Sequence, residues 1–161
     1  MELIDLHPAL VHFPLGFALA SWIGETQRTW VMPSGPSAVF WETMSRIMLW
    51  WTLPALMLAI VSGNLAHDAH GPQAQHEAVD VLENHEALGY ASAAVLVLLA
   101  FWRSVRSQAM PILEQRVYWL LLTLFLGLMA WGAYFGGRLV YQFDVGVHSA
   151  DLSFSSNQST F

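Results

Sequence analysis

Four long stretches without an ionised side chain constrain the fold of this chain more than any other feature. None contains an aspartate, glutamate, lysine or arginine, and they run from about residues 9 to 24, 47 to 66, 87 to 102 and 117 to 136. A helix satisfies its own backbone hydrogen bonds inside a bilayer and needs roughly 17–25 residues to cross it. The sequence therefore predicts an all-α fold, an integral membrane four-helix bundle.

The composition agrees with a membrane protein. Hydrophobic residues make up 55% of the 161 residues and charged residues 11%, whereas soluble domains contain about 45–50% and about 25%. One domain of four transmembrane helices is predicted over residues 1–148, with spans at about 9–26, 46–67, 85–103 and 116–137. Residues 149–161 are predicted to form a polar C-terminal tail. The sequence shows no internal repeat.

The arginines predict the orientation. Five of the six flank one set of predicted helix ends, and only Arg138 lies at the other set; the five are Arg28, Arg46, Arg103, Arg106 and Arg116. Because positive residues stay on the cytoplasmic side, both termini are predicted to be periplasmic. We expect a multi-pass protein of the bacterial inner (cytoplasmic) membrane, in contact with lipid. The formal net charge of −6 and the lack of lysine predict that no nucleic acid is bound.

All seven histidines fall on the side predicted to be periplasmic. They lie before the first and third spans or just inside the first, and after the second and fourth, at positions His7, His12, His67, His70, His76, His85 and His148. Imidazole is a common ligand of haem iron and of transition metals. The cluster therefore predicts a cofactor or metal site at this side.

His12 and His85 are the first choice for the axial ligands of a haem iron. His12 lies about one turn inside the first span, where a titratable side chain costs a few kcal/mol unless it is bonded inside the bundle. His85 begins the third span at the same predicted depth. The competing interpretation is a buried histidine bonded to a backbone carbonyl for His12 and an interfacial histidine for His85.

Other residues of the same side are alternatives or additions to this site. His67 and His70 are spaced i, i+3 on one helix face and, with His7, could bind a second haem, copper or zinc. Gly136 and Gly137 would let a flat cofactor approach the backbone, and Arg138 could pair with haem propionates. Ordinary helix packing, a solvated helix end and an interfacial salt bridge are the competing interpretations.

Two motifs resemble a known family. The opening Leu-His-Pro-Ala-Leu-Val-His-Phe-Pro-Leu-Gly of residues 6–16 and the closing Gly-Gly-Arg-Leu-Val-Tyr of residues 136–141 resemble bacterial four-helix membrane proteins of the domain of unknown function 2231. The resemblance extends to His85 and covers nearly the whole chain; Asp144 departs from it, because glycine is more usual there. It implies a respiratory setting, with Rieske-type and cytochrome c modules as redox partners.

The leading hypothesis is a non-enzymatic b-type haem protein with bis-histidine ligation. It would carry one or two haem b groups and transfer electrons at the periplasmic face, as a small subunit of a respiratory or photosynthetic redox complex. One alternative is a histidine-rich membrane protein that binds copper or zinc. A second alternative is a cofactor-free assembly or anchoring subunit.

Overall fold

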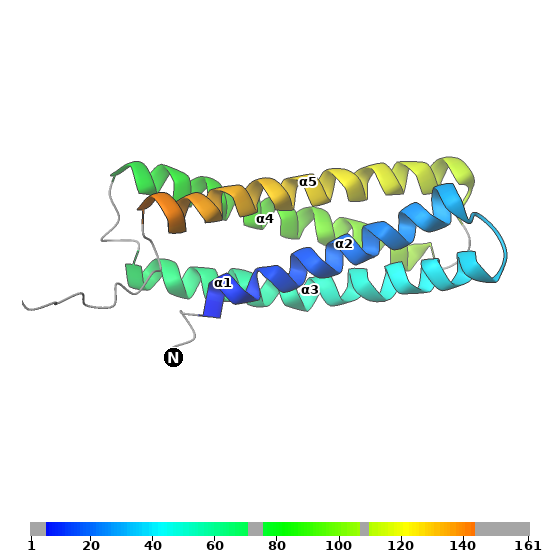
Figure 1. Cartoon of the computed structure of the whole chain (residues 1–161), viewed down its shortest axis with the longest axis horizontal. Helices are drawn as coiled ribbons and strands as arrows, with labels where there is room; N and C mark the ends of the chain where they lie inside the picture. The colour runs from blue at the N-terminus through cyan, green and yellow to red at the C-terminus, as the bar shows by residue number, and fades with distance from the viewer. Residues whose placement is uncertain (1–5, 71–75, 107–109, 144–161) are drawn as a thin grey trace, which may run out of the picture.

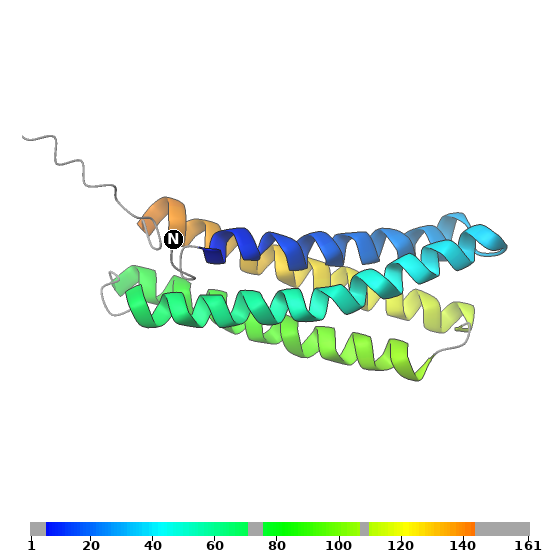
Figure 2. The same cartoon turned by 90° about the horizontal axis from the view of Figure 1, so that it is seen from below.

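The computed structural model describes residues 6–70, 76–106 and 110–143, and these form a bundle of antiparallel helices (Figures 1 and 2). No strand occurs in this part of the chain. The predicted all-α four-helix fold is therefore confirmed. The predicted C-terminal tail and His148 lie outside the described residues, as do the side chains of His70 and His76.

The first of the four antiparallel segments of the bundle is a broken helix. It consists of α1 (His7–Leu10), α2 (His12–Thr26) and a π-helical turn, η2 (Gln27–Val31). Pro14 lacks the N–H that would bond to the Leu10 carbonyl, so α1 ends at Leu10 and α2 starts again after Val11. Both α1 and α2 pack on the next helix of the chain, Pro36–His70.

The other three segments are long helices, α3 (Pro36–His70), α4 (His76–Val105) and α5 (Ile112–Phe143). By length and composition each can cross a membrane, over Pro36–Asp68, Glu77–Val105 and Ile112–Phe143. Helices of 30 to 35 residues are roughly 45–52 Å long, and the hydrocarbon core is only about 30 Å thick. Their ends therefore project beyond the apolar layer and carry the polar residues of the bundle.

Two helical hairpins pack together to make the bundle. Hairpin 1 contains α1, α2 and α3, and hairpin 2 contains α4 and α5; α2 packs chiefly on α3, and α4 chiefly on α5. At the tightest point of hairpin 1, a Cβ on Gly24 would lie 2.8 Å from the Trp41 carbonyl oxygen. Between the hairpins lies an apolar core of fully buried residues such as Leu49, Leu96 and Phe125. Large apolar side chains such as Trp51 and Leu98 point outward, as lipid contact requires.

The two ends of the bundle differ in chemistry. The starts of α1 and α4 and the ends of α3 and α5 lie toward the same end, which we call the histidine end because His7, His67 and His85 lie there (Figure 1). The opposite, arginine end holds Arg28 and Arg103. Histidines from separate helices therefore meet, as the spacing predicted.

Candidate functional site

A pair of imidazoles from the two hairpins lies at the histidine end. His7, at the start of α1, and His85, in the third turn of α4, have their ring centroids 6.3 Å apart and their ring planes at 83°. Both side chains are partly buried. Two potential ligand side chains from different hairpins thus lie edge to face at this end of the bundle.

Hydrogen bonds fix the tautomer of both rings. The Nδ1–H of His85 donates to the Gly132 carbonyl at 2.9 Å, because a carbonyl can only accept. His7 Nδ1 lies 2.9 Å from the Ser62 hydroxyl oxygen, and that hydroxyl donates its hydrogen to the Ala59 carbonyl at 3.0 Å. Ser62 therefore accepts from the Nδ1–H of His7. Both rings carry their lone pair on Nε2, the atom with which such histidines bind metals.

Each ring rests against a glycine. A Cβ on Gly63 of α3 would lie 3.0 Å from His7 Cε1, and a Cβ on Gly136 of α5 would lie 3.0 Å from His85 Cε1. Any larger residue would press on the rings. The structure thus places the expected Gly136 in the site, whereas Gly63 was missed because Ser62-Gly63-Asn64 reads as an ordinary helix segment.

Burial lowers the pKa of His7. The nearby His85 lowers the pKa further, and the backbone of Ala59, which hydrogen-bonds to the ring, opposes both effects. His7 therefore keeps its neutral form to lower pH than a free histidine does. The neutral form is the one that can bind a metal.

His12, the expected partner of His85, lies elsewhere. Its side chain is exposed, and its Nδ1–H donates to the Pro8 carbonyl one turn earlier, at 2.7 Å. The prediction compared only the depth of the histidines in the membrane and not the side of the helix on which each lies. Five residues turn a helix by about 140°, and the helix is also interrupted between the two histidines. The neighbour of His85 is therefore His7, which the sequence offered only as an alternative.

His67 is engaged with a carboxylate. Its Nδ1 bonds to Glu86 of α4, and nearby the Tyr90 hydroxyl donates to Asn64 Oδ1 at 3.0 Å. Within residues 6–70, 76–106 and 110–143, no group of three or more histidine, aspartate and glutamate side chains could hold a metal ion. The copper or zinc alternative therefore lacks a complete ligand set in that part of the chain.

The two remaining expected site residues lie near the end of α5. Gly137 has open space where a Cβ would be. The Nε–H of Arg138 donates to Gln142 Oε1 at 2.9 Å, a local i, i+4 contact. Asp144, a possible partner of Arg138, lies outside the described residues.

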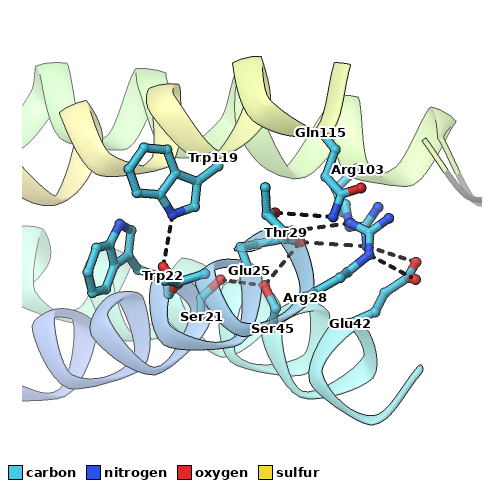
Figure 3. A network of polar contacts seen from close by, with 11 residues as sticks. Ser21, Trp22, Glu25, Arg28, Thr29, Glu42, Ser45, Arg103, Gln115 and Trp119 are labelled. Atoms are coloured by element: carbon cyan, nitrogen blue, oxygen red, sulfur yellow. Dashed lines mark hydrogen bonds and ion pairs between the residues drawn. The ribbon is translucent and has the colours of Figure 1, made fainter. Parts of the chain in front are cut away.

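The arginine end holds a buried ion-pair network that the sequence did not reveal (Figure 3). Glu25 is fully buried, and Arg28 and Arg103 are 4% and 1% exposed. Arg28 contacts Glu25 at 3.2 Å and Glu42 at 3.3 Å, and Arg103 contacts Glu42 at 2.8 Å and Glu25 at 3.6 Å. The network joins α2, η2, α3 and α4 and balances two positive charges with two negative ones.

Neutral hydrogen bonds extend this network to α5. Gln115 donates to Thr29 at 3.1 Å, and the Trp119 indole donates to Thr26 at 2.8 Å (Figure 3). The arginines were interpreted as markers of a membrane interface, which assumes that they are solvated. The sequence did contain a signal for this network. Two carboxylates, Glu25 and Glu42, lie on helices that face those arginines.

These features define a helical membrane protein with a two-imidazole site at one end of its bundle. A model of the DUF2231 family, described as a predicted membrane protein, matches residues 3–149. The chain therefore belongs to this family, as its motifs indicated. No curated protein and no solved structure matches it.

Proposed function

We propose that the protein is a b-type haem protein that transfers electrons, with His7 and His85 as the axial ligands of one haem. The observation that carries this proposal is the close pair of imidazoles from the two hairpins, in which both Nδ1 atoms are bonded to the protein and both Nε2 atoms carry lone pairs. His85 keeps the role that the sequence suggested for it, and His7 takes the place of His12.

The spacing of the rings fits two ligands of one metal. Metal–imidazole bonds of about 2.0–2.1 Å place the centroids of two rings on opposite sides of one ion about 6 Å apart. The observed separation is 6.3 Å. Gly63 and Gly136 let each ring lie close against a helix backbone. The type of donor atom and the spacing of the two rings support the proposal.

The number of ligands favours haem over a bare metal ion. A porphyrin supplies four nitrogens, so two protein ligands complete the coordination of its iron. A structural zinc site needs four protein ligands, and a catalytic one needs three. Among the described residues no such set of three exists. The pair is sufficient for haem and insufficient for zinc.

Electron transfer suits the site better than catalysis. Bis-imidazole ligation leaves the iron no open position, so the bound haem supplies one-electron chemistry. The site also lies near a bundle end that carries exposed carboxylates at Asp68, Asp80 and Glu83. A negative surface attracts a basic electron carrier. This supports cytochrome c or Rieske-type partners, which the family resemblance implies, and a role as a subunit of a larger redox complex.

Absorption spectra of the protein extracted from membranes in mild detergent test the proposal. The oxidised and dithionite-reduced spectra should show Soret and α bands, and a pyridine haemochrome assay should identify haem b. His7→Ala and His85→Ala should each remove the bands. His12→Ala is the matched control and should keep them, because its ring is exposed and bonds only to its own helix.

Three outcomes would contradict the proposal in different ways. A featureless spectrum of protein isolated with its native cofactors would reject haem, and elemental analysis would then test for copper or zinc. Bands that survive in both His7→Ala and His85→Ala would reject this pair. Bands lost in His12→Ala but kept in His7→Ala would restore the pair expected from the sequence.

A further inference from the structure

We infer that the bundle is a fused pair of equivalent His–Gly hairpins, and that Glu25 and Arg103 occupy equivalent positions whose opposite charges make the two hairpins pair with each other. The first helices of both hairpins run away from the histidine end (Figures 1 and 2). A pseudo-two-fold axis along the bundle therefore relates hairpin 1 to hairpin 2. This inference concerns the chain itself and stands whether or not iron is bound.

The two histidines have equivalent surroundings. In hairpin 1 the His7 ring lies against Gly63, with Cε1 at 3.0 Å and Nδ1 at 3.5 Å from the Cβ position. In hairpin 2 the His85 ring lies against Gly136, with the same atoms at 3.0 and 3.4 Å. Each ring is also linked to the backbone carbonyl four residues before its glycine, His85 directly to Gly132 and His7 through the Ser62 hydroxyl to Ala59.

The buried positions of the first helices follow the same register. A shift of 78 residues places His7 on His85 and superimposes four further buried positions of α2 on buried positions of α4. These pairs are Pro14 and Ser92, Ala18 and Leu96, Ser21 and Leu99, and Glu25 and Arg103.

The second helices repeat the correspondence. A shift of 73 residues places Gly63 on Gly136 and again superimposes buried positions, here of α3 on α5. These pairs are Ser45 and Tyr118, Leu49 and Leu122, Thr52 and Phe125, and Ala59 and Gly132. The helix contacts agree, because α2 packs on α5 to nearly the same extent as α4 packs on α3.

The repeat was invisible in the sequence because equivalent positions share burial and not identity. A packed core requires apolar or small residues at the right helical period, and many combinations fill the same volume. Thr52 and Phe125 illustrate this, since both are fully buried although their side chains differ greatly in size. The two hairpins share only the histidines, the glycines and the helical period of their buried positions.

Glu25 and Arg103 are equivalent positions that carry opposite charges in the two hairpins. Under the shift of 78 residues they are equivalent, and they contact each other across the bundle at 3.6 Å. Two copies of hairpin 1 would bring two glutamates together at this point, and two copies of hairpin 2 would bring two arginines together. Buried like charges are strongly unfavourable, so the opposite pair selects hairpin 1 with hairpin 2.

Pairs of spin labels test the symmetry directly. The chain contains no cysteine, so cysteines can be introduced in pairs at Leu19, Trp51, Val97 and Leu124, which are all exposed. Pulsed dipolar spectroscopy of the full chain should give the same distance for the Leu19–Leu124 and Val97–Trp51 pairs. The Leu19–Trp51 and Val97–Leu124 pairs should likewise agree. Distances within either comparison that differ by more than the width of the label distributions would overturn the equivalence.

A charge exchange tests the role of the ion pair. Glu25→Arg and Arg103→Glu should each lower the Tm of the detergent-solubilised chain by on the order of 10 °C, because each leaves uncompensated buried charge. The double variant restores an opposite pair at these two positions, but it sets the new arginine beside Arg28 and the new glutamate beside Glu42. It should therefore recover only the part of the loss that belongs to the contact between positions 25 and 103. If the Tm loss of the double variant equals or exceeds the sum of the two single losses, the pairing role is overturned. Spin-label distances in the double variant, measured at the same four positions, should be unchanged.

Discussion

At the scale of single residues, the imidazole pair depends on the glycines behind it. His7 and His85 are each oriented by one hydrogen bond to Nδ1 and by close contact of Cε1 with a glycine. A bonded Nδ1 holds a ring in one orientation. The geometry of the two imidazoles is therefore set by the backbone and side-chain groups packed against them.

Gly63→Ala and Gly136→Ala should each displace one ring and weaken haem binding. The new Cβ would lie 3.0 Å from Cε1 of the histidine it faces, so the ring must shift. Haemin titration of cofactor-free protein, followed by the Soret band, should show an affinity at least several-fold lower for both variants. Unchanged affinity in both would show that the glycines do not hold the rings.

Gly89→Ala and Gly127→Ala are matched controls for these variants. A Cβ at either position meets no atom within 4 Å. Alanine is favoured over glycine in a helix by up to about 1 kcal/mol. Both controls should therefore bind haemin normally and unfold at the same or a higher temperature.

The sequence predicted two of the residues that meet at the histidine end. Seven histidines on one side indicated a candidate ligand site, which stays a prediction, and the structure places His85 and Gly136 in contact there. The structure places His7, and not His12, beside His85, because the separation of five residues from His7 to His12 turns the helix by about 140°. Gly63 lies 56 residues from His7, and no local pattern links residues so far apart.

At the scale of helices, polar contacts tie the hairpins together near the arginine end. The Trp22 indole donates to Thr123 and the Trp119 indole to Thr26, both at 2.8 Å, so each hydrogen bond crosses from one hairpin to the other. A buried donor left without an acceptor costs more than the bond itself contributes. These indoles therefore fix how the hairpins are aligned.

Trp119→Phe should destabilise the bundle by about 1 kcal/mol, because it removes the donor to Thr26 and keeps most of the apolar surface. This corresponds to a Tm lower by roughly 2–4 °C, measurable by circular dichroism in detergent. Trp131→Phe is the control, because Trp131 is 61% exposed. Equal Tm changes in the two variants would contradict a hydrogen-bond effect.

Helix type and order were predictable from the four apolar stretches, but helix ends were not. The helices extend beyond the apolar stretches at both ends, through residues such as Glu42 before the second stretch and Arg103 after the third. These polar residues resemble loop residues when the sequence is considered alone. In the structure Glu42 and Arg103 bond to each other across the bundle.

At the scale of the whole molecule, the predicted orientation places the histidine end in the periplasm. Glu83 and Ser37 are exposed near the histidine end and the arginine end, respectively. Because the chain has no cysteine, single Glu83→Cys and Ser37→Cys variants report each end separately. In intact spheroplasts a membrane-impermeant maleimide should label Glu83→Cys only, and lysis should expose Ser37→Cys. The reverse pattern would place the histidine end in the cytoplasm.

The apolar layer between the two polar ends has a consequence for how this protein could handle charge. Residues 13–24, 47–66, 87–102 and 117–137 contain no group that gains or loses a proton near neutral pH. Within these ranges no ionisable side chain links the imidazole pair with the ion-pair network. If the pair binds haem as proposed, we expect its midpoint potential to follow the pH on the histidine side and not the pH on the arginine side.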